Sequence, residues 1–187
     1  MKRYILKFIM VLTITLTACK KQEPVNVRVP YEDTVILVGP ATIDGFSEEP
    51  FNEWYDENYK AYQINESLLP SIRKNLENTS ITVFMGTWCG DSQREIPNFI
   101  KILKAADFDF DNFNIITVDS DKKTPQNLER GLNITNVPTL IFYKNGKELN
   151  RIVEFPLESL EEDMLKILKD QPYEHAYFNV ELQNDSE

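Results

Sequence analysis

One cysteine of this chain stands in a stretch that favours nucleophilic chemistry. The sequence FMGTWCGDSQREIP runs from Phe84 to Pro97, and within it Cys89 is followed three residues later by Ser92. Two cysteines at this spacing can attack a disulfide and then release the product, because the second thiol breaks the mixed disulfide that the first has formed. Here a hydroxyl replaces the second thiol. Cys89 can therefore begin such an exchange, but Ser92 cannot complete it.

The residues on either side of Cys89 predict a strand that runs into a helix. SITVFMG, residues 80–86, is a short apolar run typical of a buried strand. Apolar residues then recur at helical spacing: Ile96, Phe99, Ile100 and Leu103. A cysteine at a helix N-terminus lies near the positive end of the helix dipole, which favours the thiolate that attacks sulfur. The carboxylate of Asp91 opposes that charge, although it suits the start of a helix.

Strand and helix patterns alternate along the rest of the chain. We expect a strand at 34–39, a helix within 65–78, a strand within 113–121, a short helix at 124–131, a hairpin over 138–155 and a helix that begins at Ser159. Asn145-Gly146 is typical of the type I′ turn of a hairpin, and Ser159 with Glu162 forms a capping box. This order predicts an α/β fold in which helices flank a central mixed β-sheet.

Four features, in this order along the chain, resemble the thioredoxin family. Trp88-Cys89-Gly90 stands where the family has its WCG sequence, and Pro97 stands where it has a proline that kinks the helix. Val137-Pro138-Thr139 matches the loop that contains a cis-proline, and the hairpin TLIFYKNGKEL is similar to that of the family. The resemblance covers about residues 65–169 and implies a thioredoxin-like fold. It implies that Cys89 and Ser92 are catalytic, and that an extended substrate strand is bound by Trp88, Gly90, Asp91, Val137 and Pro138.

Three departures from the family pattern affect the expected chemistry. Ser92 replaces the second cysteine, Asp91 replaces the usual proline, and Val83 stands where the family has a buried aspartate that accepts a proton. We therefore expect a thiol–disulfide oxidoreductase or isomerase that acts on protein thiols or disulfides through Cys89 and depends on an external thiol for resolution. The alternative is a redox-inactive module that binds extended protein segments beside Pro138.

Two other hypotheses for Cys89 have less support in the sequence. A lone exposed thiolate can form a sulfenic acid, as in a peroxidase, but Gly86 stands where the peroxiredoxin family has a threonine. His175, the single histidine, could form a catalytic pair with Cys89, but it lies in a polar tail after the last predicted helix. One histidine and two cysteines are too few for a zinc site. We expect neither a metal nor a cofactor.

The composition narrows the classes of partner. The chain has 187 residues, of which 42% are hydrophobic, so it can form a core of ordinary size. Its net charge of −10 argues against nucleic acid, because there is no excess of cations to displace counterions from phosphates. It also argues against a polybasic contact with anionic lipid.

The first residues are typical of an export signal. MKRYILKFIMVLTITLTACK has two basic residues, then an apolar run too short for a transmembrane helix, then small residues. The stretch Leu16 to Cys19 resembles the bacterial lipoprotein box, which implies cleavage before Cys19 and lipid attached to its thiol. An ordinary signal peptide with a chance cysteine is the alternative. Lys20, rather than aspartate, follows Cys19 and implies the periplasm-facing outer membrane if the source is Gram-negative.

These observations predict five segments. We expect a lipoprotein signal peptide at 1–18, a tether at 19–30, an extension packed on the domain at 31–64, a thioredoxin-like domain at 65–170 and a tail at 171–187. The two cysteines have separate roles in this scheme, so no structural disulfide is expected.

Overall fold

The computed structural model describes residues 24–179. The predicted signal peptide, Cys19 and the end of the tail lie outside the described residues.

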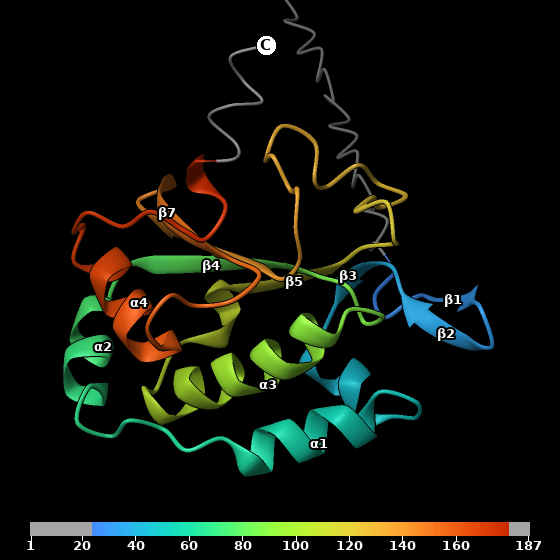
Figure 1. Cartoon of the computed structure of the whole chain (residues 1–187), viewed down its shortest axis with the longest axis horizontal. Helices are drawn as coiled ribbons and strands as arrows, with labels where there is room; N and C mark the ends of the chain where they lie inside the picture. The colour runs from blue at the N-terminus through green and yellow to red at the C-terminus, as the bar shows by residue number, and fades with distance from the viewer. Residues whose placement is uncertain (1–23, 180–187) are drawn as a thin grey trace, which may run out of the picture.

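A five-stranded mixed sheet forms the centre of the molecule (Figure 1). Its strands, in spatial order, are β3 (Gly39–Ala41), β5 (Phe113–Thr117), β4 (Thr79–Met85), β6 (Thr139–Lys144) and β7 (Lys147–Val153). β4 and β5 are parallel, and every other pair in this sheet is antiparallel. Asn145 and Gly146 both have positive φ in the turn between β6 and β7, as a type I′ turn requires. The predicted mixed sheet and hairpin are confirmed.

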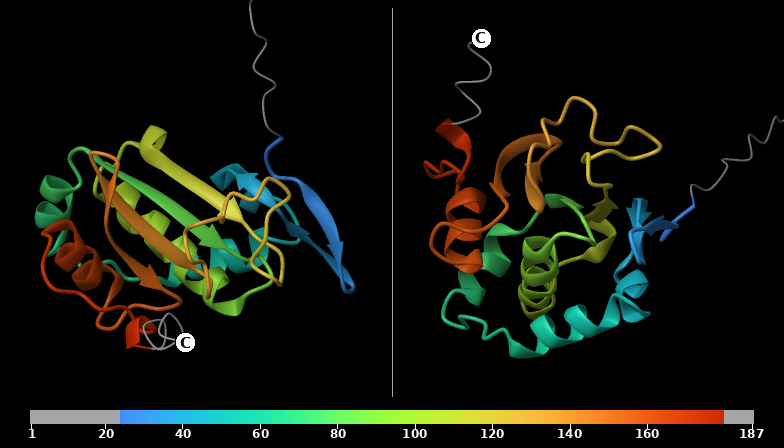
Figure 2. Two further views of the ribbon diagram at one scale, coloured as in Figure 1. Left: turned by 90° about the horizontal axis from the view of Figure 1, so that it is seen from above. Right: turned by 45° about the vertical axis from the view of Figure 1, so that its right-hand side comes forward.

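Within residues 24–179, four α-helices lie on one side of this sheet (Figure 1). They are α1 (Asn52–Ala61), α2 (Leu69–Asn75), α3 (Gly90–Ala105) and α4 (Leu160–Leu168). α3 lies directly against the sheet and α1 lies beneath α3, farther from the strands, as the right-hand view of Figure 2 also shows. The predicted capping box is present, because Ser159 Oγ accepts the Glu162 N–H at 3.1 Å and donates to the Glu162 carboxylate at 3.0 Å. The helices that the sequence predicted within 65–78 and after Ser159 are confirmed.

Residues 118–136 lie over one end of the opposite face of the sheet (Figures 1 and 2), and within this segment the predicted helix at 124–131 is wrong. The Thr124 hydroxyl donates to the Glu129 carboxylate at 2.9 Å and accepts the Leu128 N–H at 2.8 Å. Asn127 has a φ of 56°, which is not helical. Side-chain hydrogen bonds and short backbone turns thus pair the backbone N–H groups here in place of regular helical bonds. Leu128, Leu132 and Ile134 of this segment pack against the apolar cluster beside Cys89.

The N-terminal part of the described chain differs from the expected tether and strand, whereas the aromatic residues of the expected extension pack on the domain as predicted. The predicted strand at 34–39 is interrupted: β2 (Thr34–Leu37) pairs with β1 (Arg28–Tyr31) as a separate hairpin, and β3 starts at Gly39, whose φ is +95°. The first three residues of β1 fall inside the range expected to be a tether. Figure 2 shows this hairpin projecting at one end of the central sheet. α1 packs against α3, in a stretch where the sequence showed no clear period.

The C-terminal residues return to the domain. The Tyr173 hydroxyl donates to the Asp163 carboxylate at 2.8 Å, and Asn150 Nδ2 donates to the Tyr173 carbonyl at 2.8 Å. His175 is buried and contacts the ring of Phe178 edge-on. The described part of the tail is therefore packed on the domain, where the sequence predicted only a polar tail.

Candidate active site

Cys89 lies at the junction that the sequence predicted, between the end of β4 and the start of α3. It is the N-cap residue of α3, with extended backbone angles, and the helix begins at Gly90. The Cys89 thiol is partly exposed and donates to the carbonyl oxygen of Val137, with 3.2 Å between sulfur and oxygen. A nucleophilic sulfur is thus held at a helix N-terminus and beside a second loop.

That second loop contains the proline expected from the family resemblance. The Val137–Pro138 peptide bond is cis, and both residues are buried. The Glu154 N–H, just after β7, donates to the Pro138 carbonyl at 2.6 Å. The loop is therefore fixed between the start of β6 and the end of β7, with the Val137 carbonyl directed at the thiol.

Ser92 lies in the first turn of α3 and is fully buried. Its hydroxyl oxygen accepts the Gly86 N–H at 3.2 Å. A serine hydroxyl also has one proton to donate, and the bond to Gly86 does not use it. This bond links Ser92 to Gly86, three residues before Cys89.

Trp88 is held in place by two contacts. Its indole N–H donates to the Val118 carbonyl at 3.0 Å. Its ring also lies against Gly86, where an added Cβ would be 2.6 Å from Trp88 Cε2. Gly86 is therefore needed for this ring position. By contrast, a Cβ on Gly90 would meet no atom within 4 Å, so the surface beside the sulfur is open to a substrate.

Arg94 weakens the expected effect of the Asp91 carboxylate on the Cys89 thiolate. It lies one turn along α3 and forms an ion pair with Asp91 at 2.6 Å and a second with Glu95 at 2.7 Å. The cation offsets part of the negative charge that Asp91 places near the sulfur. Burial raises the pKa of Glu95 above its ordinary value, although Arg94 acts in the opposite direction.

Val83 stands where the family resemblance would place a buried aspartate. Val83 is completely buried in β4 and pairs with Leu140 and Ile115 on the neighbouring strands. No proton acceptor therefore replaces the family aspartate at this position. Among residues 24–179, no group of three or more potential metal ligands occurs, and no helix is long and apolar enough to cross a membrane.

A family model described as "Thioredoxin" matches residues 46–169 of the chain. The chain belongs to the thioredoxin family. The match extends well past the WCG and cis-proline loops and begins before α1, so it includes part of the segment that the sequence led us to treat as an extension.

Individual thioredoxins resemble parts of the chain. Thioredoxin from Mycoplasma genitalium is 33% identical over 85 residues, which are 46% of this chain and 74% of that protein. Thioredoxin-2 from Saccharomyces cerevisiae is 36% identical over 70 residues, or 37% of this chain and 62% of the relative. Among solved structures, oxidized thioredoxin O2 from Arabidopsis thaliana is 31% identical; the match covers 46% of this chain and 71% of that chain, with a TM-score of 0.31.

The structure adds two residues to the site that the sequence analysis missed. Thr87 is buried, and its hydroxyl oxygen accepts the Leu37 N–H at 3.1 Å, which attaches the N-terminal hairpin to the loop before Cys89. Arg94 is the second, through its pair with Asp91. The helical spacing of Asp91 and Arg94 is visible in the sequence and is the signal that could have identified their pairing.

Proposed function

We propose that this thioredoxin-family protein catalyses thiol–disulfide exchange on protein substrates through the single thiol of Cys89, with an external thiol as the resolving group. The observation that supports this best is the placement of Cys89 Sγ, at the start of α3 and 3.2 Å from the carbonyl that precedes cis-Pro138. Ser92, buried at the position of a second thiol, supports a monothiol cycle.

The first step forms a mixed disulfide. The partly exposed Cys89 thiol loses its proton to solvent, and the thiolate attacks one sulfur of the substrate disulfide. A bond forms between Cys89 and that sulfur, the substrate S–S bond breaks, and the second substrate sulfur leaves as a thiolate that takes up a proton. The N-terminus of α3 stabilises the negative charge on Cys89 before the attack, and the open surface beside Gly90 admits the substrate chain.

The second step needs a thiol from outside this domain. If another thiolate of the same substrate attacks the substrate sulfur, a new substrate disulfide forms, Cys89 is released and the net reaction is isomerisation. If a small thiol attacks the sulfur of Cys89, the substrate leaves reduced and the small thiol remains on Cys89. A second small thiol then releases Cys89 and forms the oxidised small-molecule disulfide, which balances the two electrons given to the substrate.

The reactivity of Cys89 tests this proposal. Protein that lacks residues 1–19 is mixed with a peptide whose only cysteine is joined by a disulfide to a small thiol, and the peptide adduct is followed by mass spectrometry. We expect one peptide on Cys89, formed faster than on a model cysteine peptide, and none on Cys89→Ser. If Cys89 reacts no faster than the model thiol and no adduct accumulates, the exchange proposal fails and the binding module beside Pro138 becomes the better explanation.

We also propose that the mature protein is exported and held at the membrane by acyl chains on Cys19. The sequence around Cys19 supports this, and two or three acyl chains suffice for stable attachment. Mass spectrometry of protein from its native host should find an acylated N-terminal Cys19, and Cys19→Ser should abolish both acylation and partition into detergent. An unmodified Cys19 within an intact precursor would exclude the anchor without affecting the chemistry of Cys89.

A further inference from the structure

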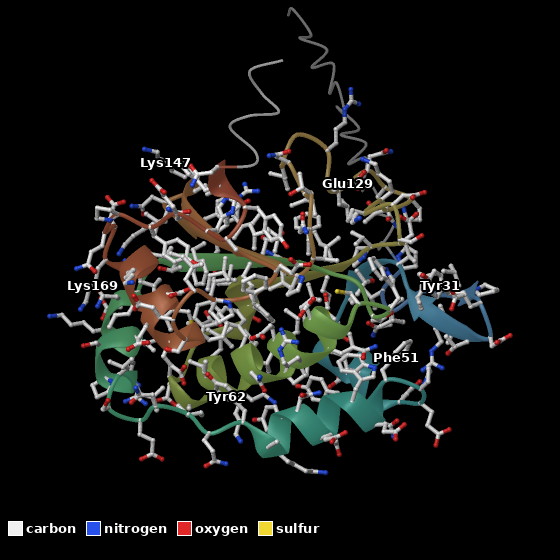
Figure 3. All side chains as sticks on the ribbon, in the orientation of Figure 1. Tyr31, Phe51, Tyr62, Glu129, Lys147 and Lys169 are labelled. Carbon is white, nitrogen blue, oxygen red and sulfur yellow. The ribbon has the colours of Figure 1, made fainter. Side chains whose placement is uncertain are left out.

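A cavity lies next to the active site, between the N-terminal hairpin, the start of α1 and the Cys89 loop. Its volume is about 290 Å³. Its walls include Tyr31 and Glu32 of the hairpin, Phe51 and Trp54 around the start of α1, and Trp88 and Gln93 of the active-site region. Figure 3 shows Tyr31 and Phe51 on the same side of the molecule, one on the hairpin and the other below it on the segment that leads into α1.

Residues around this cavity are hydrogen-bonded to the loop that precedes Cys89. The Leu37 N–H, at the end of β2, donates to Thr87 Oγ1 at 3.1 Å, and Gln93 Nε2 donates to the Thr87 carbonyl at 2.8 Å. Trp88 forms one wall and directly precedes Cys89. A substrate whose sulfur is bonded to Cys89 therefore brings the residues next to its own cysteine within reach of the cavity.

The lining combines aromatic rings with one carboxylate. Its aromatic residues are Tyr31, Phe51, Trp54 and Trp88, and its one charged residue is Glu32. Aromatic faces attract cations and also cover the apolar stem of a long side chain. The protein already uses this chemistry nearby, since the Arg28 guanidinium lies 5.5 Å from the centre of the Phe51 ring and pairs with Glu48 at 2.7 Å.

The charge around the cavity favours a basic occupant. A shallow depression that shares Pro50 with the cavity contains Glu49 and Glu53. The chain as a whole carries a net charge of −10. An acidic side chain would be repelled by Glu32, whereas a purely apolar one would gain nothing from it. A lysine or arginine side chain can contact the rings with its stem and reach Glu32 with its charge.

We propose that this cavity binds a lysine or arginine side chain of the substrate protein, from the segment beside the disulfide that Cys89 attacks. This proposal rests on the proposed exchange activity and adds a substrate class to it: disulfides flanked by a basic residue. The N-terminal hairpin and α1 then form a specificity surface for the reaction at Cys89.

Peptide disulfides that differ at one flanking position test the proposal. The full chain carrying Cys19→Ala, in detergent, is mixed with three peptides that have arginine, norleucine or glutamate beside the disulfide. The rate of mixed-disulfide formation is measured for each, with a small uncharged disulfide as the reference for intrinsic reactivity. We expect the arginine peptide to react about fivefold faster than the glutamate peptide, with norleucine between them, and the difference to shrink at high salt.

Two single-charge variants separate the cavity from the general charge of the surface. Glu32→Gln removes the carboxylate in the cavity, and Glu57→Gln removes an exposed carboxylate on α1 that lies outside its lining. We expect Glu32→Gln to lose most of the preference for arginine and Glu57→Gln to keep it. Both residues are exposed, so neither change threatens the fold.

The outcomes also distinguish the two proposals. Equal rates for the three peptides, a norleucine rate equal to that of arginine, or equal effects of the two variants would overturn the basic-residue proposal while leaving exchange at Cys89 intact. If no disulfide reacts, including the small reference, the exchange proposal fails. The cavity is then tested with the same peptides carrying serine for cysteine: the indole N–H signals of Trp54 and Trp88 should shift with the arginine peptide alone, and an equal shift with the glutamate peptide would overturn it.

Discussion

The Cys89 thiol and the Val137 carbonyl oxygen lie 3.2 Å apart, although the two residues are 48 positions apart in the chain. The thiol donates and the carbonyl accepts, so the bond exists only while Cys89 holds its proton. The sulfur thus loses this partner when it becomes the thiolate. At that moment the N-terminus of α3, where Cys89 is the N-cap residue, can stabilise its charge.

The position of the Trp88 ring depends on the absence of a side chain at residue 86. Gly86→Ala would place a Cβ 2.6 Å from Trp88 Cε2. We expect the ring to move, its bond to Val118 to break, and the free energy of unfolding to fall by about 1–3 kcal/mol. Gly90→Ala is the matched control, because its Cβ meets nothing within 4 Å. Chemical denaturation of both variants checks this, and equal losses would contradict it.

The bond between Leu37 N–H and Thr87 is expected to hold the hairpin against the active-site loop. Thr87→Val keeps the shape of the side chain but leaves a buried N–H without its acceptor, which costs about 1–3 kcal/mol. The Leu37 amide should then exchange with solvent much faster. Thr82→Val, in the middle of β4, makes the same chemical change without touching this bond. Unchanged exchange at Leu37 in Thr87→Val would show that the hairpin is held by other contacts.

The ion pair between Asp91 and Arg94 is expected to tune the reactivity of Cys89. Arg94→Gln leaves the Asp91 charge uncompensated near the sulfur, so alkylation of Cys89 at neutral pH should slow by about two- to fivefold. Asp91→Asn should accelerate it by a similar factor. Lys104→Gln, in the last turn of α3, is the control for loss of a cation from the same helix. Alkylation rates that do not respond to either change would mean that the pair is only structural.

Glu95 is expected to make stability depend on pH. Burial raises its pKa in the folded protein, so the folded protein binds this proton more tightly than the unfolded chain does. The stability due to protonated Glu95 is fully present below the ordinary glutamic acid pKa and is lost as pH rises through the raised value. Denaturation at a series of pH values should show this loss in wild type and not in Glu95→Gln. Parallel pH profiles of the two proteins would contradict the effect.

Local sequence patterns predicted much of the fold correctly. A buried strand, a turn with Trp-Cys-Gly and a helix of regular period placed Cys89 correctly, and the Asn-Gly turn and the Ser159 capping box each depend on a few adjacent residues. Such features are predictable because neighbouring residues determine them.

The structure differs from the sequence prediction where side-chain hydrogen bonds or residues distant in the chain determine the backbone conformation. Thr124 and Glu129 bond to the backbone of 124–131 and replace the expected helix. Gly39 turns the chain out of the expected strand and lets β3 pair with β5, more than seventy residues away. The fixed position of Thr87 depends on Leu37, and the buried state of Tyr173 depends on Asp163. Nothing in the local sequence indicates these pairings.

The lifetime of the mixed disulfide on Cys89 tests the monothiol cycle most directly. Wild type and Ser92→Cys, both lacking residues 1–19, are loaded with a peptide whose only cysteine is joined by a disulfide to a small thiol, so that the adduct on Cys89 carries no second peptide thiol. Both are then freed of excess reagent and of the released small thiol, and followed by mass spectrometry without added thiol. We predict a wild-type adduct that persists and then disappears when a small thiol is added, whereas the thiol introduced by Ser92→Cys releases the peptide by itself. A wild-type adduct that decays as fast as that of Ser92→Cys, or one that never forms, would contradict a cycle that starts at Cys89 and ends with an external thiol.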